Sequence, residues 1–301
     1  MSIDQFFPAP IVRFDGRSTP KRMVSRSTTP ENALEARVDR RVSLVLPCFN
    51  EESNIEQTIR SVQEWFKSDH IDGQIIVTDD GSTDGSLCLL RKLQEEMPNL
   101  DVVHHEKNQG YGAAVRSGCD MAQKEWIAFM DSDGQFQPSD LRRLLPLTNE
   151  TVYVAGVREK RADTLQRLLN GRMYRLLVRV VLGVRSSDPN CGMKLFRRSL
   201  WPTIRPIHAT GALINAEMFY RMKKASIPWM EVLVPHYPRL AGKPTGANVR
   251  VILRMFKELW RLKRTRSGMA PAPAAMTEPA TVDSSADCYD APEPVYTLSD
   301  Q

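Results

Sequence analysis

An uninterrupted apolar run long enough to cross a membrane is missing from this chain of 301 residues. A transmembrane helix needs about 18 such residues, and the best candidate, 176–184, is interrupted by Arg179. The N-terminus also lacks the basic and then apolar layout of a secretory signal peptide. We therefore expect a cytoplasmic protein without a membrane-spanning helix, which could still bind peripherally to the cytoplasmic face of the membrane.

Cysteine is scarce, and the five residues form no C-x-x-C pair: Cys48, Cys88, Cys119, Cys191 and Cys288. An odd, dispersed set argues against a disulfide framework or a zinc site, and it fits a reducing compartment. The glycine fingerprints of the P-loop and of the dinucleotide-binding turn are also missing. Without them, a dinucleotide oxidoreductase is not expected.

Basic residues are absent from the segment 267–301, which carries six acids. Removing those six charges from the net charge of +5 leaves residues 1–266 at +11. A body this basic predicts anionic partners such as phosphates or a negatively charged membrane face. The chain contains no nucleic-acid-reading motif, so we expect no nucleic-acid partner.

Composition also divides the chain into four segments. Residues 1–40 are rich in Arg, Ser, Thr and Pro, and residues 267–301 are rich in Ala, Pro, Ser and acids. Both show no apolar periodicity, and we expect them to be disordered. Between them we expect a catalytic domain at 41–248 and a basic amphipathic helix at 249–266.

Apolar runs suited to buried strands alternate in the domain with apolar residues at helical spacing. Strands are predicted at 42–46, 75–78, 102–104 and 126–130, and helices at about 55–66, 87–97 and 112–123. This order predicts an α/β fold with a mostly parallel central sheet flanked by helices on both faces. Ligands of such sheets bind beyond the carboxyl ends of the strands.

Acids follow three of these strands at the predicted ligand edge. Asp131 and Asp133 lie two residues apart after a buried strand, so their carboxylates can converge on one divalent cation such as Mg²⁺. The cation would bridge a diphosphate; the alternative is an ordinary acidic turn. Asp80 could accept hydrogen bonds from a base or ribose, whereas Asp84 is interpreted as a helix cap.

With these motifs, the chain resembles the family-2 glycosyltransferases of GT-A fold, and among them the polyprenyl- or dolichyl-phosphate mannose or glucose synthases. The resemblance covers about residues 41 to 265. It is carried by six stretches in this order: 45–51 (VLPCFNE), 79–84 (DDGSTD), 108–112 (NQGYG), 130–135 (MDSDGQ), 188–194 (DPNCGMK) and 234–242 (VPHYPRLAG).

The resemblance implies a role for each residue that matches a family motif. Residues expected to hold the nucleotide are Pro47, Phe49, Glu51, Thr78 and Asp80, with Ser132 beside the donor. Residues expected to hold Mg²⁺ or Mn²⁺ are Asp131, Asp133 and Gln135. Residues expected near the phosphates are Arg158, Arg239 and, from a shifted position, Lys243. Asp188 would either orient the acceptor or, with a hydroxyl acceptor, act as the base; both roles stay open.

Two later segments, 164–184 and 249–266, place apolar residues among arginines and lysines. Basic amphipathic helices with large apolar side chains suit a membrane interface. Each Lys or Arg contributes roughly 1 kcal/mol near an anionic leaflet. The alternative is that both helices pack their apolar side onto the protein's own sheet.

The sequence thus predicts a metal-dependent, inverting transfer of a hexose from a UDP- or GDP-sugar to a polyprenyl phosphate. An anionic acceptor needs positioning by cations and no general base, and no His lies in a motif typical of a base. One alternative is a glycosyltransferase of the same family that acts on a glycan hydroxyl. Another is a non-catalytic protein that binds a nucleotide-sugar.

Overall fold

A mixed β-sheet forms the centre of the structure, a computed structural model that describes residues 11–14, 21–23, 38–159, 165–211, 213–238, 258–259 and 261–262. Within these residues the sheet has nine strands in the order β2-β1-β9-β7-β8-β6-β3-β4-β5. The strands are β1 (Ile11–Phe14), β2 (Lys21–Met23), β3 (Arg41–Cys48), β4 (Asp72–Asp79), β5 (Leu100–His104), β6 (Trp126–Phe129), β7 (Tyr153–Arg158), β8 (Lys194–Arg197) and β9 (Trp229–Val234).

Parallel pairing joins the strands that the sequence predicted. β3 pairs in parallel with both β4 and β6, and β4 pairs in parallel with β5. β8 runs antiparallel to β6 and to β7, and thereby connects this block to the parallel pair of β7 and β9. The predicted α/β fold is confirmed. The carboxyl ends of β5, β4, β3 and β6 consequently meet at one edge of the sheet.

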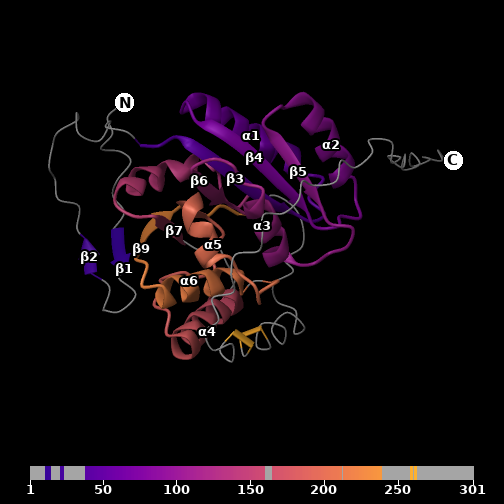
Figure 1. The fold of residues 1–301 in the computed structure, drawn as a ribbon. Coiled ribbons are helices and arrows are strands. Elements are labelled where there is room, and N and C mark those ends of the chain that lie inside the picture. Colours follow the sequence, from indigo (N-terminus) through magenta and orange to yellow (C-terminus); the bar gives the residue numbers. More distant parts are fainter. Residues whose placement is uncertain are drawn as a thin grey trace, which may run out of the picture. The chain divides into compact units, whose positions relative to one another are not determined.

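The helices lie on both faces of the sheet, with α1 and α2 on one side and α3, α4 and α6 on the other (Figure 1). Their bounds are α1 (Ile55–Ser68), α2 (Ser86–Glu96), α3 (Tyr111–Asp120), α4 (Leu165–Leu182), α5 (Trp201–Ile204) and α6 (Ile214–Lys224), with short 3-10 turns η2 (Pro138–Arg143), η3 (Leu145–Asn149) and η4 (Arg198–Leu200). The helices predicted near 55–66, 87–97 and 112–123 correspond to α1, α2 and α3.

Alternation along β3 explains why the chain forms a two-sided core. Leu44 and Leu46 pack with α1 and α2 in one cluster, whereas Val45, between them, packs with α3 in the other. Successive side chains of a strand point to opposite faces. A continuous apolar run is therefore what a central strand covered on both faces requires.

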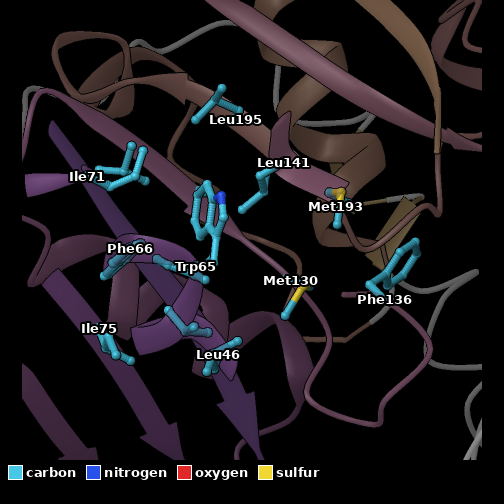
Figure 2. Close-up of a cluster of buried hydrophobic side chains, with 14 of the residues drawn as sticks. Leu46, Trp65, Phe66, Ile71, Ile75, Met130, Phe136, Leu141, Met193 and Leu195 are labelled. Atoms are coloured by element: carbon cyan, nitrogen blue, oxygen red, sulfur yellow. The ribbon is translucent and has the colours of Figure 1, made fainter. Parts of the chain in front are cut away.

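The first of these clusters extends to the edge where the predicted ligand site lies. In Figure 2, Phe66 of α1 lies toward Ile75 at one end of the cluster, Trp65 of α1 lies in the middle, and Met130, Phe136 and Met193 lie toward the other end. Fully burying a side chain of this kind stabilises the fold by about 1.5–3 kcal/mol. The loops around residues 131–135 and 188–192 are thus anchored by buried apolar neighbours.

Two short strands fall in the segment 1–40, which we expected to lack regular structure. β1 pairs with β2 and with β9, both antiparallel. The four domain boundaries otherwise stay a prediction. Among the helices in the described part of the chain, none is long and apolar enough to span a membrane.

Candidate active site

Three loops meet at the carboxyl edge of β3, β4 and β6. Cys48 and Asp79 are register partners at the ends of β3 and β4, and the Asp80 N–H donates to the Cys48 carbonyl over 2.8 Å. The loop after β6 is tied to the same place, since the Ser132 hydroxyl donates to the Pro47 carbonyl over 2.6 Å. Apart from Arg158, Asp188, Arg239 and Lys243, the candidate residues lie on these three loops or at the strand ends before them, and the structure brings the loops together.

The nucleotide candidates on β3 and β4 lie side by side. Pro47 and Thr78 are register partners, and the Thr78 hydroxyl oxygen is buried without a hydrogen-bond partner in the described structure. Phe49 projects outward with 41% of its surface exposed. Glu51 is anchored at the start of α1, where its carboxylate accepts from the Asn54 amide over 2.8 Å. This edge offers the exposed ring of Phe49 to a ligand, whereas the Thr78 hydroxyl is buried beside α3, where a Cβ on Gly118 would lie 2.9 Å from its oxygen.

Asp80 is 2% exposed and is bonded by its own chain. Its Oδ1 accepts from the Gln109 N–H over 2.9 Å, and its Oδ2 accepts from the Gly110 N–H over 2.8 Å. His105, which sequence reasoning missed, places Nδ1 2.7 Å from Oδ1 of Asp80. Asp80 therefore positions the glycine-rich entry to α3, and its contact with a base or ribose stays a prediction.

Asp84 precedes Gly85, the residue at the N-cap of α2, and the predicted cap is therefore wrong in position, since no side chain makes the N-cap hydrogen bond. Oδ1 of Asp84 accepts from the Ser86 N–H over 3.0 Å, and its Oδ2 accepts from the Glu52 N–H over 3.3 Å. Asp84 thus joins the loops that follow β3 and β4.

Asp131 and Asp133 form the acidic centre of the site. Burial first, and the charge of Asp133 second, raise the pKa of Asp131 to about 6. The Tyr111 hydroxyl donates to Asp131 Oδ1 over 2.8 Å, and burial together with the charge of Asp131 raises the pKa of Tyr111 well above its usual value. The Gly192 backbone is so close to Asp131 that a Cβ there would lie within 2.6 Å of both carboxylate oxygens.

This donor set fits a divalent cation bound jointly with a substrate. Two nearby carboxylates raise each other's pKa unless a positive charge compensates them. In the described part of the chain, no group of three or more His, Cys, Asp or Glu side chains could hold a metal alone. Mg²⁺ is typically bound by one or two carboxylates together with substrate phosphates, which Asp131 and Asp133 could satisfy.

Gln135 links this loop to the segment that follows β9. Its carbonyl accepts from the Tyr237 N–H over 3.0 Å, and its side-chain amide donates to the Tyr237 carbonyl over 3.4 Å. Its predicted role as a metal ligand is untested. Arg239 and Lys243, predicted to bind phosphate, lie outside the described residues.

Arg158 and Asp188 meet in a bidentate ion pair. Nε of Arg158 lies 2.6 Å from Oδ2 of Asp188, and Nη2 lies 2.8 Å from Oδ1. The two side chains are only 12% and 11% exposed. Paired, planar contacts of this kind combine strength with fixed geometry. The structure therefore joins two predicted catalytic residues to each other.

Two buried charges that sequence reasoning missed fix the loop 187–193. Lys194 donates to the Cys191 carbonyl, and Glu231 accepts from the Ser187 N–H over 3.0 Å. Burial lowers the pKa of Lys194 and raises that of Glu231. The available signal differed between the two: Glu231 lies inside the otherwise apolar strand β9, whereas Lys194 is only the first residue of β8, before two apolar residues. Such residues are almost never buried unless paired.

Residues 43–221, more than half of the chain, match the family model described as "Glycosyl transferase family 2". Two curated relatives are named undecaprenyl-phosphate 4-deoxy-4-formamido-L-arabinose transferase. The one from Pseudomonas syringae pv. syringae (strain B728a) is 27% identical over 71% of this chain and 63% of its own length. The one from Salmonella choleraesuis (strain SC-B67) is 27% identical over 72% and 66%. The chain thus spans less than two thirds of these relatives.

Solved structures with a similar fold include glucosyl-3-phosphoglycerate synthase from Mycobacterium tuberculosis. Its complex with phosphoglyceric acid gives a TM-score of 0.57 at 21% identity, covering 77% of this chain and 86% of that one. Its complex with Mn²⁺, uridine diphosphate and glucosyl-3-phosphoglycerate gives 0.55 at 21% identity, covering 78% and 87%. At this identity the likeness shows the fold alone.

Proposed function

This chain belongs to glycosyl transferase family 2 and is a glycosyltransferase, and we propose that it moves a hexose, with inversion, from a nucleotide-diphosphate donor to a polyprenyl phosphate. The acceptor class is supported by the relatives named undecaprenyl-phosphate transferases. The donor class is supported by the structural neighbour that binds uridine diphosphate with Mn²⁺. A UDP-hexose and a GDP-hexose both remain candidates.

The observation that carries the proposal is the carboxylate pair of Asp131 and Asp133 at the edge where the strands end. Burial and the charge of Asp133 raise the pKa of Asp131 to about 6. In the proposal these two residues, with Gln135, hold Mg²⁺ or Mn²⁺. When bound, such a cation neutralises the charge of a departing nucleoside diphosphate.

The remaining residues bind and orient the two substrates. Pro47, Phe49 and Thr78 would hold the base and ribose beside the ends of β3 and β4. The bond between the anomeric carbon and the donor diphosphate breaks, while an oxygen of the lipid phosphate bonds to that carbon from the opposite face. Because the lipid phosphate is already anionic, the step needs positioning rather than a general base.

In the proposal, basic residues position the acceptor. The ion pair of Arg158 with Asp188 fixes the loop 187–193 beside Asp131, and Arg239 and Lys243 are proposed as phosphate ligands. Asp188 is thereby proposed to orient the acceptor side of the site. Both carboxylate oxygens of Asp188 accept hydrogen bonds from Arg158, which favours an orienting role, and with it the phosphate acceptor, over the role of a base for a hydroxyl.

Helix α4 supports contact with a membrane surface. Met173, Leu176 and Val180 recur at helical spacing and are 57%, 60% and 73% exposed. The opposite face packs Tyr174 and Val178 into the core. Arginines 172, 175 and 179 are exposed beside the apolar stripe, and α4 contains no acid. We propose that this stripe brings the site to an anionic membrane that holds the lipid acceptor.

The second predicted membrane segment, 249–266, is described at four residues only. Leu259 and Leu262 are 3% and 4% exposed and pack into the core cluster of α4 and α6. These two positions favour the alternative, in which the segment packs onto the protein itself. The membrane proposal therefore rests on α4.

The test is a transfer assay with radiolabelled UDP- and GDP-hexoses, Mg²⁺ or Mn²⁺, and polyprenyl phosphate in detergent micelles. We expect label to enter the organic phase as a sugar-phosphoryl lipid with at least one donor, and to stay in the aqueous phase with the folded variant Asp131→Ala. If label appears only on an added glycan, the acceptor is a glycan hydroxyl and not a polyprenyl phosphate. If no donor supports transfer, the chain is a non-catalytic protein that binds a nucleotide-sugar.

A further inference from the structure

One hydrogen bond connects the glycine-rich entry of α3 to the acidic loop after β6. Tyr111, the first residue of α3, donates its hydroxyl to Oδ1 of Asp131 over 2.8 Å. The Gly192 backbone lies so close to the same carboxylate that a Cβ there would lie within 2.6 Å of both of its oxygens. The Asp131 side chain is therefore held by a phenol from one element and confined by the backbone of another.

The residues that precede Tyr111 in the chain fix its position. The two residues before it, Gln109 and Gly110, donate their N–H groups to the buried carboxylate of Asp80. Gly110 has a φ of 104°, which a residue with a side chain rarely adopts. His105 braces Asp80 through Nδ1 and reaches α3 through Nε2, 2.9 Å from the hydroxyl of Ser117.

The first turn of α3 is also fixed by the segment that precedes α6. The Gly112 N–H donates to the Thr210 carbonyl over 2.8 Å, and the Ala113 N–H shares the same acceptor at 3.3 Å. A Cβ on Gly112 would lie 2.8 Å from the Gly211 carbonyl oxygen. The helix start thus has little room to move, and the phenol has a defined position.

We propose that Tyr111 is a positioning residue that holds the Asp131 carboxylate in the orientation that binds the divalent cation. An ionised carboxylate offers about four acceptor positions, so one bond from a phenol leaves capacity for a cation. Groups that hydrogen-bond to a metal ligand commonly change metal affinity by about 10–100-fold. This inference rests on the proposed function, because it presumes that Asp131 is a metal ligand.

The variant Tyr111→Phe removes the hydroxyl and keeps the ring. Mn²⁺ is titrated into the full chain with UDP and, separately, with GDP, and bound Mn²⁺ is measured by the loss of its electron paramagnetic resonance signal relative to a protein-free blank. We expect the Mn²⁺ Kd to rise about tenfold. Turnover should fall at low Mn²⁺ and return toward the wild-type value at saturating Mn²⁺.

Tyr153→Phe is the matched control. Its hydroxyl is buried in the core and has no hydrogen-bond partner in the described structure, so its loss should leave Mn²⁺ binding unchanged. The melting temperature of each variant shows whether the fold is kept.

Wild-type Mn²⁺ affinity in Tyr111→Phe would overturn the positioning role and leave the proposed function intact. A loss of turnover that saturating Mn²⁺ does not restore would overturn it as well, because the hydroxyl would then act elsewhere. If the wild-type chain binds no Mn²⁺ with either nucleotide, the metal-dependent function itself fails and the inference fails with it.

Discussion

Replacing Gly192 with alanine would displace the Asp131 carboxylate without changing its chemistry. A Cβ at this position would lie within 2.6 Å of both carboxylate oxygens. Nonbonded heavy atoms keep a separation of roughly 3.5 Å, so one of the two groups must shift by about 1 Å or more. Gly192 does not have a positive φ, and the backbone itself therefore accepts alanine.

The displaced group should be the carboxylate rather than the loop. Arg158 holds Asp188, and Lys194 holds the Cys191 carbonyl, so the loop that carries Gly192 is bonded on both sides. A misplacement of about 1 Å can cost about 100-fold in rate, which corresponds to about 2.7 kcal/mol in the activation free energy. We expect kcat for sugar transfer to fall by about this factor.

The assay measures kcat for lipid-linked product together with the melting temperature. Gly183→Ala is the control, because Gly183 has a φ of 63° and a Cβ there would meet the flexible end of Lys223. This control should lose about 1 kcal/mol of stability and keep the wild-type kcat. If Gly192→Ala also turned over at the wild-type rate, the position of Asp131 would not matter for catalysis.

Two further predictions concern stability and membrane contact. Burial raises the pKa of Asp140 to about 6, so the folded state binds more protons than the unfolded state between about pH 4 and 6. Stability therefore falls as pH rises through this window. Asp140→Asn should raise the free energy of unfolding by on the order of 2 kcal/mol at pH 7.5 and by almost nothing at pH 3.5. Urea unfolding at each pH measures this difference. An equal gain at both pH values would contradict the reasoning. Leu176→Glu should lower the amount of protein that sediments with anionic phosphatidylglycerol vesicles about tenfold. Ile207→Glu, at a side chain that is 43% exposed and lies outside α4, should not lower it. Equal losses in the two variants would contradict a specific role of α4.

The strands β3 to β6 and the helices α1 to α3 were predictable from local patterns, whereas β7, β8 and β9, which carry Arg158, Lys194 and Glu231, were not predicted. The apolar run of β3 and the spacing of Ile55, Ile59 and Val62 in α1 reflect burial within one element. The acids after β4 and β6 could be assigned to one edge because parallel strands end together. β1 and β2 were missed, because their short stretches IVRF and KRM fall in a segment rich in Arg, Ser, Thr and Pro.

Contacts between distant residues were not predictable. Neither Tyr111 nor Asp131 carries a sign of its partner, because the bond depends on how α3 packs against the sheet. Glu231 interrupts the apolar strand β9 and Lys194 begins β8, and both patterns indicate an exposed position as readily as a buried one. The two apolar faces of α4 had the same ambiguity, since spacing alone does not tell which face the core covers.

The most direct test of the proposed function is whether nucleotide binding depends on a divalent cation held by Asp131 and Asp133. Binding of UDP and GDP is measured by calorimetry with Mn²⁺ and with EDTA, for the wild-type chain and for Asp131→Ala. We expect one nucleotide to bind the wild-type chain at least tenfold more tightly with Mn²⁺, and this gain to vanish in the variant. Equal affinity with Mn²⁺ and with EDTA, or a full gain in Asp131→Ala, would contradict the assignment of this carboxylate pair as the metal site.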